Sequence, residues 1–370
     1  GLQHVMAMFI GNLTPLIIVM GVCGLTADAG FGELRTALLQ NAMIIAGVVT
    51  LVQMFSIGPV GGKVPIVMGT SSGFLGVLNN TVAACGGGIL AYGAIMGACI
   101  VGGIFESVLG AFLKPLRKFF PPIVTGSVVI AIGLSLLGVG INYFCGGSGK
   151  ADYGSLPNLF LGFVVLVVIV LLKHFAPQKS ILSSSAILFG ILAGYVVAII
   201  MTLTLPHTGI DADGVQYTYS WVVDFAQVKN AAWIAVPSFI GFGALSDVKI
   251  TFQASAIIPI GIMFIVTAIE TVGDISACIE GGMDREATDS ELSGGVICDG
   301  LGSSFAALFG VLPNTSFSQN VGLVAMTKVV NRMALASGAI FLILCGLIPK
   351  LGALISIMPQ AVLGGAAVMM

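Results

Sequence analysis

Long apolar runs, separated by short polar or Pro/Gly-rich breaks, recur along the whole chain. A transmembrane helix needs about 20 mostly apolar residues. Runs of that length predict helices near 5–25, 37–57, 66–82, 88–113, 123–142, 157–174 and 181–203, and then near 252–280, 292–310, 311–329 and 334–357, with another beginning near 360. The pattern therefore predicts an all-α polytopic membrane protein.

A polar stretch, 204–250, separates the two groups of helices. It contains both tryptophans, Trp221 and Trp233, together with tyrosines and aspartates, which is typical of an extramembrane loop with an interfacial segment. We therefore divide the chain into a first unit (1–203), this loop (204–250) and a second unit (251–370).

The composition supports this division and excludes several classes of protein. Hydrophobic residues make up 57% of the chain and charged residues 8%, against about 25% charged in a soluble domain. The net charge of -2 and the lack of any basic block argue against nucleic-acid binding. The seven cysteines lack the spacing of a metal site or a disulfide framework. No P-loop or other catalytic motif is present, so we expect neither an enzyme nor a metal protein.

The positively charged residues predict the orientation in the membrane. Nine of them follow even-numbered helices and five follow odd-numbered ones. Because cytoplasmic loops carry the excess of Lys and Arg, we expect a cytoplasmic N-terminus in a multi-pass protein of the cytoplasmic membrane.

An internal repeat organises the two units. The Gly-Thr-Ser of 69–71 recurs as Asn-Thr-Ser at 314–316, and Gly-Ala-Ile at 93–95 recurs at 338–340, both with an offset of 245. Seven helices precede the loop, so the second unit would lie upside down relative to the first, as in inverted-repeat transporters. Continuing the repeat predicts fourteen helices ending at about residue 440, with the second seven incomplete in this sequence.

Segments 65–73 and 313–320 make poor helices, because both are rich in hydroxyls, amides, Gly and Pro. Irregular backbone at membrane depth needs a protein interior or a wet cavity around it. We expect each segment to run extended and then start a half-helix, whose N-terminal N–H groups could hold a polar ligand. The alternative is that both segments are packing seams of small residues.

Ionisable residues inside the spans are the second sign of a site, because each is costly in lipid. Glu270 and Asp274 lie four residues apart and share a helix face. Since two close carboxylates repel, one of them should hold a proton, which makes the pair a candidate proton carrier. Asp299 suits either a coupling role or a structural one. For Glu106, near the polar end of its helix, we expect the carboxyl to snorkel to the membrane boundary.

Amides and a histidine add further candidates. Gln319 offers an acceptor and a donor, which matches the edge of a purine dione. Asn320 could bind ligand or brace its loop. His4, at the start of the first helix, could titrate or form a structural hydrogen bond.

The run Gln-Asn-Val-Gly-Leu-Val-Ala-Met-Thr-Lys at 319–328 resembles the signature of the nucleobase-ascorbate transporter family. Three further pieces follow in family order: Gln3-His4, the Glu-Thr-Val-Gly-Asp of 270–274, and Asp299-Gly300. The resemblance covers essentially the whole chain. It implies two inverted sets of seven helices, with short antiparallel strands in the third and tenth. It also implies a core domain (helices 1–4 and 8–11), a gate domain (helices 5–7 and 12 onward) and a homodimer.

The resemblance also implies roles for residues. Glu270 and Gln319 correspond to side chains that hold the base, and the ligand would be flanked by Ser72, Gly73, Phe74 and Ser318. Asp274, Asp299, Asn320 and His4 correspond to affinity, coupling or structural positions.

The function implied is proton-coupled uptake of a purine nucleobase, xanthine or uric acid, with the proton as coupling ion and no other cofactor. Gln319 and Asp274 both favour these bases. A uracil carrier of the same family, an anion exchanger or channel with the same fold, and a purely structural membrane protein stay as alternatives.

Overall fold

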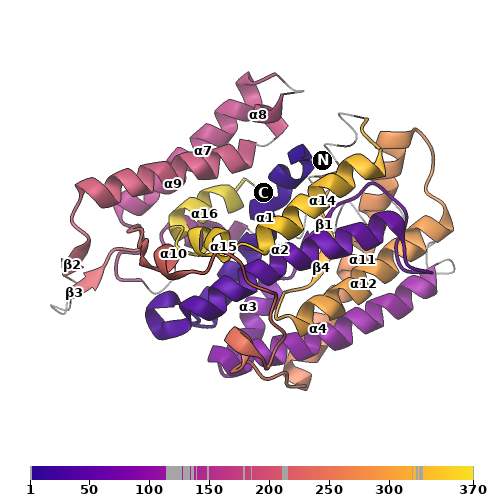
Figure 1. Cartoon of the computed structure of the whole chain (residues 1–370), viewed down its shortest axis with the longest axis horizontal. Helices are drawn as coiled ribbons and strands as arrows, with labels where there is room; N and C mark the ends of the chain where they lie inside the picture. The colour runs from indigo at the N-terminus through magenta and orange to yellow at the C-terminus, as the bar shows by residue number, and fades with distance from the viewer. Residues whose placement is uncertain are drawn as a thin grey trace. The chain divides into compact units, whose positions relative to one another are not determined.

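The computed structural model of the chain is mostly helical (Figure 1). It describes residues 2–113, 127, 134, 137, 138, 140–147, 150–177, 180–184, 186–210, 216–318, 320, 321, 324 and 328–369. Two compact units divide the chain, and each is discontinuous in sequence. The first comprises Gly1–Ile132 and Ala231–Gly352, and the second comprises Gly133–Asn230 and Ala353–Met370.

Seven helices make up most of the described part of the first unit: α1 (Leu2–Val22), α2 (Gly32–Phe55), α3 (Leu75–Ala84), α4 (Gly88–Ala111), α11 (Ala254–Met283), α12 (Asp289–Leu308) and α14 (Arg332–Gly346). A short π-helix, η1 (Ala27–Phe31), leads into α2. Helix α4 packs along α12 and α11, and α14 packs along α2 (Figure 1).

Glycines bring α4 and α12 unusually close together. A Cβ atom added at Gly103 would lie 2.3 Å from the carbonyl oxygen of Gly300, and one added at Gly300 would lie 2.3 Å from the carbonyl oxygen of Gly103. Small residues allow such close approach of two backbones, which is how helices associate in lipid without a hydrophobic driving force. The side chains beside this contact are consequently enclosed on several sides.

Two short strands cross the interior of the first unit. β1 (Met68–Thr70) pairs antiparallel with β4 (Asn314–Ser316), with Gly69 opposite Thr315, and every residue of both strands is buried. Two more bonds extend the pairing, from the Ser71 N–H to the Pro313 oxygen and from the Phe317 N–H to the Val67 oxygen. The backbone polar groups of these extended segments are thereby satisfied away from water.

The described helices of the second unit are α7 (Leu156–Phe175), α8 (Ile181–Ser184), α9 (Ala186–Thr204), α10 (Ala226–Asn230) and α16 (Gln360–Ala367). α7 and α9 pack together, and α16 lies against both. At one end, the buried carboxylate of Asp152 accepts bonds of 2.8 Å from both the N–H and the hydroxyl of Ser220, and one of 3.1 Å from Asn158. This network holds the segment after β3 against the start of α7.

Stretch 204–250, which the sequence predicts to be an extramembrane loop with an interfacial segment, contains a hairpin of β2 (Thr208–Ile210) and β3 (Gln216–Thr218), the helix α10 and a 3-10 turn, η3 (Gly243–Leu245). One helix prediction from the sequence was wrong in detail. The helix expected at 334–357 is two helices, because α14 ends at Gly346 and α15 (Pro349–Ser356) begins at a proline, which has no N–H to continue the ladder. Most of the helix expected at 123–142 lies outside the described residues.

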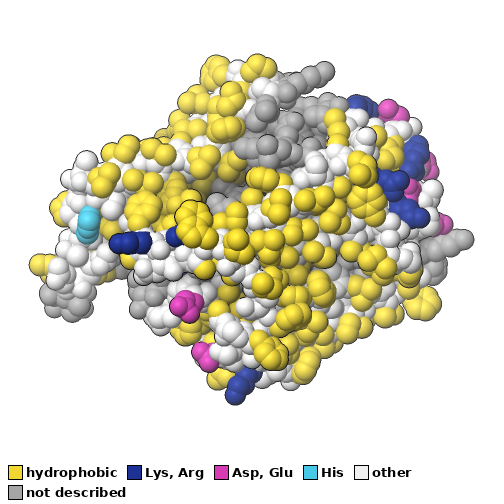
Figure 2. Space-filling model, viewed as in Figure 1, with side chains coloured by type: hydrophobic (Ala, Val, Ile, Leu, Met, Phe, Trp, Pro, Cys, Tyr) yellow, Lys and Arg dark blue, Asp and Glu magenta, His cyan; other side chains and the backbone are white. Residues whose placement is uncertain are grey.

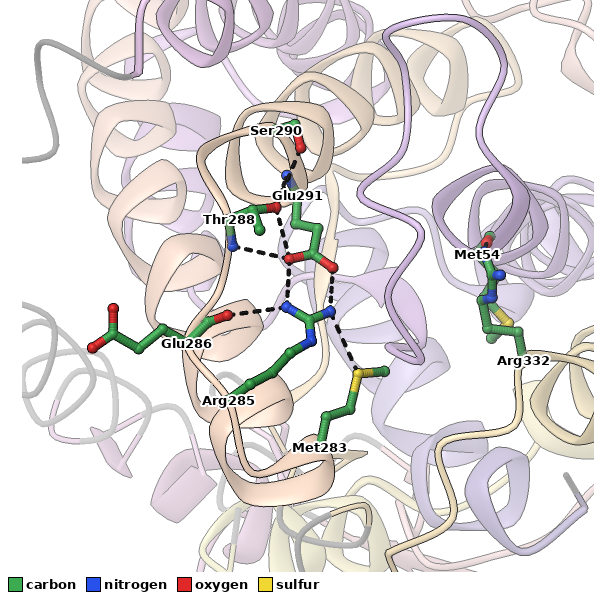
Figure 3. Close-up of polar contacts among 8 residues, drawn as sticks. All are labelled: Met54, Met283, Arg285, Glu286, Thr288, Ser290, Glu291 and Arg332. Carbon is green, nitrogen blue, oxygen red and sulfur yellow. Dashed lines mark hydrogen bonds and ion pairs between the residues drawn. The ribbon is translucent and has the colours of Figure 1, made fainter.

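The turn between α11 and α12 is polar and well bonded (Figure 3). The guanidinium of Arg285 contacts both carboxylate oxygens of Glu291, at 2.5 and 2.9 Å. Thr288 and Glu291 form a capping box that satisfies N–H groups at the start of α12. The hydrogen bond from Arg285, with those from Thr288, lowers the pKa of Glu291 to about 2.

The exposed surfaces of several helices are apolar, as expected for helices in contact with lipid. The described part of the chain contains five helices long and apolar enough to cross a membrane: Ala29–Phe55, Gly88–Ala111, Leu156–Phe175, Ala186–Thr204 and Ala254–Met283. Figure 2 shows hydrophobic side chains spread over much of this face, whereas charged side chains lie in a few groups, the largest at the right-hand edge. Exposed apolar surface of this extent indicates contact with a membrane.

Candidate functional site

A buried carboxylate on α11 binds the segment that contains β4. Asp274 accepts a hydrogen bond of 2.7 Å from the hydroxyl of Ser316 and bonds of 2.9 and 3.0 Å from that of Ser318. The Asp274 side chain is nearly inaccessible to solvent. A buried carboxylate requires such donors, so these bonds place the end of β4 against the middle of α11.

A second buried acid joins this group from α12. The hydroxyl of Thr271 donates to Asp299 and lies 3.3 Å from the hydroxyl of Ser316. The two hydroxyls therefore lie in contact between the two acids, with Thr271 donating to Asp299 and Ser316 donating to Asp274. Sequence analysis did not single out Thr271, although it lies inside the 270–274 segment on which the family resemblance rests.

Glu270 lies one turn before Asp274 on α11, as the spacing predicted. Its Oε2 atom is buried and has no hydrogen-bond partner in the structure. This carboxyl thus retains an unused position for a ligand or a proton. Gln319, the residue expected to face it, lies outside the described residues.

The stretch Ser72–Phe74 joins β1 to α3. Phe74 is completely buried, and its ring meets that of Phe264 on α11 edge to face, with ring centroids 4.8 Å apart. The carbonyl of Ser72 accepts from the N–H of Leu75, the first residue of α3. Because α3 begins here, its positive dipole end lies directly after Gly73 and Phe74.

Asn320 and His4 differ in what the structure says of them. The Asn320 side chain donates to the carbonyl of Pro65 at 3.2 Å, which connects the chain after β4 to the segment before β1. This contact matches the bracing alternative for Asn320. His4 lies in α1, and its side chain is outside the described part of the structure.

Glu106 does not snorkel, and that prediction was wrong. Its side chain has no exposed surface, and one carboxyl oxygen accepts a bond of 3.3 Å from Thr267 on α11. The reason is the glycine contact described above: Glu106 follows Gly103 by three residues, so both lie on the face of α4 that α11 and α12 cover.

No cation offsets the four buried carboxyls within the part of the chain that the structure describes. The ion pairs found there, Arg285–Glu291 and Lys328–Asp284, lie at an end of α11. Nor do the described residues contain a cluster of three His, Cys, Asp or Glu suited to a metal ion. Buried carboxyl and hydroxyl groups from α4, α11, α12 and β4 therefore lie together at this place in the first unit.

The sequence profile of the Permease family matches residues 1–370. The chain belongs to this family. It is 38% identical to the "Putative purine permease CPE0397" of Clostridium perfringens, covering 100% of this chain and 74% of that protein. It is 34% identical to the uric acid permease PucK and 36% identical to the xanthine permease of Bacillus subtilis, covering 100% of this chain and 77% and 76% of theirs. These findings confirm the resemblance to the nucleobase-ascorbate transporters.

Solved structures with a similar fold are more distant in sequence. The transmembrane domain of the cyanobacterial bicarbonate transporter BicA matches with a TM-score of 0.63 at 17% identity, over 100% of this chain and 86% of that one. SLC26A9 matches with a TM-score of 0.61 at 13% identity, over 99% of this chain and 56% of that one. Membership of the Permease family, together with the apolar helices, makes this chain an integral membrane protein of a transporter family rather than an enzyme.

Proposed function

We propose that this permease takes up a purine nucleobase, xanthine or uric acid, together with protons across the cytoplasmic membrane. The observation that carries the proposal is its identity of 34 to 38% to proteins named as purine, uric acid and xanthine permeases, over the whole of this chain. The site supplies the chemistry such a substrate needs.

The proposed binding site uses both strand segments and α11. A purine dione has adjacent N–H and carbonyl groups on one edge, which a carboxylate and an amide can match. Glu270 has an uncommitted, buried oxygen for an N–H group, and we assign Gln319 to the neighbouring donor and acceptor. The base would be bordered on one side by Ser72, Gly73 and Phe74. On the other side it would be bordered by Ser318, which follows β4 and donates a hydrogen bond to Asp274.

We infer an inverted repeat from the strand pairing. The segments 69–71 and 314–316, which correspond in the repeat, lie on the two strands that pair, with Gly69 opposite Thr315 and Thr70 opposite Asn314. Antiparallel pairing of two equivalent segments supports a two-fold axis between the strands.

The two compact units suit alternating access. We assign the core domain to the first unit, which contains β1, β4 and the carboxyls, and the gate domain to the second. Movement of one unit against the other would expose the base to each side in turn. We retain the homodimer and the cytoplasmic N-terminus as parts of this proposal.

Uptake of radiolabelled xanthine and uric acid into cells or proteoliposomes tests it. We expect uptake to be abolished by a protonophore and by Glu270→Gln. The exposed Glu280, on the same helix, offers a matched control, since Glu280→Gln should leave uptake unchanged. Uptake that persists in Glu270→Gln and ignores the protonophore would refute proton-coupled transport through this site.

Two alternatives give different results. A uracil carrier would take up uracil, and unlabelled xanthine would not compete. An anion exchanger is suggested by the fold shared with a bicarbonate transporter, although a likeness at 17% identity concerns the fold alone. It would exchange anions or pass current in liposomes and would not need a carboxylate at Glu270.

A further inference from the structure

Glu106 is a buried acid for which the proposed purine site has no use. It comes from α4, whereas Glu270 and Asp274 come from α11. Its Oε1 atom accepts the single bond from Thr267, and its Oε2 atom is buried without a hydrogen-bond partner. An ionised carboxylate has about four acceptor positions to fill, so Glu106 is poorly equipped to be charged.

Asp299 repeats this situation across the helix contact. It is completely buried on α12, its Oδ2 accepts from Thr271, and its Oδ1 has no hydrogen-bond partner. The hydroxyls bonded to the two acids, Thr267 and Thr271, lie one turn apart on α11, and Gly103 and Gly300 beside the acids are in contact. The two carboxyls are therefore close enough to repel each other when both are charged. Each acid therefore has one carboxyl oxygen that forms a hydrogen bond and one that forms none, and both acids lie between α4, α11 and α12.

The other groups around the pair do not relieve it. From α11, Thr267 and Glu270 face Glu106, and Asp299 interacts with both Glu270 and Asp274. Helix α3, which also packs against α4, carries no titratable residue. Among the residues that the structure describes, the charged groups facing the pair are thus all acids, and a buried charge without a partner cation is strongly disfavoured. Glu106 and Asp299 therefore cannot both be ionised at the same time.

We propose that Glu106 and Asp299 form a second proton-binding site of this permease, enclosed between α4, α11 and α12 and distinct from the Glu270–Asp274 pair. At neutral pH the two carboxyls carry at least one proton between them. Thr271 and Ser316 connect this site to Asp274, so its protonation state is felt at the strand that borders the substrate. In this respect the inference rests on the proposed function, since a stored proton matters to transport only if transport is proton-coupled.

Infrared titration of the purified full chain tests the site directly, because protonated carboxyl groups absorb apart from carboxylates. The variant Glu106→Gln keeps the side-chain shape but cannot ionise. We expect it to lose one protonated carboxyl at neutral pH, whichever acid of the pair holds the proton. If Glu106 holds it, the group is gone; if Asp299 holds it, that acid ionises once its acidic neighbour becomes an amide donor.

Two variants make the result decisive. Glu280→Gln, the same substitution at an exposed position of α11, should leave the buried band unchanged. Thr267→Val serves if Glu106→Gln does not fold: the Thr267 hydroxyl is the bonding partner of Glu106, so its loss should shift the pH at which the band disappears. An unchanged band in Glu106→Gln, or an unmoved one in Thr267→Val, would overturn the second site.

Uptake separates this inference from the proposed function. We expect Glu106→Gln to take up xanthine with a weakened dependence on external pH, while Glu280→Gln keeps the wild-type dependence. If purine uptake is normal but the infrared band does not respond to Glu106→Gln, the second proton site is wrong and the function stands. If the band responds as expected but the wild-type chain takes up no purine base, the function is wrong and the proton site stands.

Discussion

The reciprocal glycine contact between α4 and α12 makes a sharp prediction about stability. Gly300→Ala would place a methyl group 2.3 Å from the backbone oxygen of Gly103, and also 2.5 Å from Ser107 Oγ and 2.6 Å from its N–H. An ordinary carbon–oxygen contact is about 3.3–3.6 Å. The helices would therefore have to separate by roughly 1 Å, because a backbone oxygen cannot swing aside as a flexible side chain can.

The steric destabilisation by Gly300→Ala can be separated from the change in helix propensity by making the same substitution at a glycine on a neighbouring helix. At Gly261 of α11 an added Cβ meets no atom within 4 Å. Both substitutions gain the same helix propensity, about 0.5–1 kcal/mol. The difference between them therefore measures the steric contact alone, and we expect about 1–3 kcal/mol of destabilisation for Gly300→Ala relative to Gly261→Ala.

A thiol-reactive fluorescent dye provides the assay. Cys99 on α4 and Cys298 on α12 are buried in the folded chain and become reactive when it unfolds, above a background from the partly exposed Cys85 and Cys145. In detergent, Gly300→Ala should unfold several degrees below the wild type, and Gly261→Ala at or above it. Equal unfolding temperatures for the two variants would show that the α4–α12 contact is looser than the structure indicates.

Three further predictions use the same unfolding assay. The side-chain amide of Asn41 donates to the backbone oxygens of Ser238 and Phe309 at 2.8 Å each. Asn41→Ala should therefore destabilise the first unit by about 1–3 kcal/mol for each carbonyl that loses its donor. An unchanged stability would mean that these hydrogen bonds are absent. Thr288→Ala should cost about 0.5–2 kcal/mol through loss of the helix cap, and an unaffected transition would contradict the capping box. The pKa of Glu291 is lowered from 4.5 to about 2, chiefly by the hydrogen bond from Arg285. The ionised carboxylate therefore contributes fully to folding stability above pH 4.5, and this contribution is lost as the pH falls towards 2. The stabilities of the wild type and Glu291→Gln should converge over that range, and a constant difference between them would contradict the lowered pKa.

Apolar runs predicted several long helices well because lipid demands continuous apolar stretches. The expected 88–113 and 252–280 correspond to α4 (Gly88–Ala111) and α11 (Ala254–Met283). The same criterion failed at Pro349, where apolar residues continue on both sides of Pro349 and Lys350 but the missing N–H of the proline separates α14 from α15. It also missed β2 and β3, since three-residue strands are too short to show an alternating pattern.

At the candidate site, helix periodicity predicted only what lies on one helix. The four-residue spacing of Glu270 and Asp274 identified two acids with a common face, and both are largely buried. The bonds from Ser316 and Ser318 to Asp274 could not be predicted, because they depend on how far β4 extends along α11. That register is a tertiary property, set by the pairing of β4 with β1.

The burial of Glu106 could have been predicted from the size of its neighbouring residues, although not from hydropathy alone. A charged residue near the end of an apolar run suggests snorkelling only if its helix face meets lipid. The residues beside it, Gly103, Ser107 and Gly110, are all small, and a stripe of small residues marks the face on which a membrane helix packs against another helix. Glu106 lies within that stripe, whereas its exposed neighbours Ile104, Phe105 and Val108 are large and apolar. Side-chain size around an intramembrane acid therefore predicts its burial better than its distance from the helix end, because close backbone packing requires small residues and lipid contact does not.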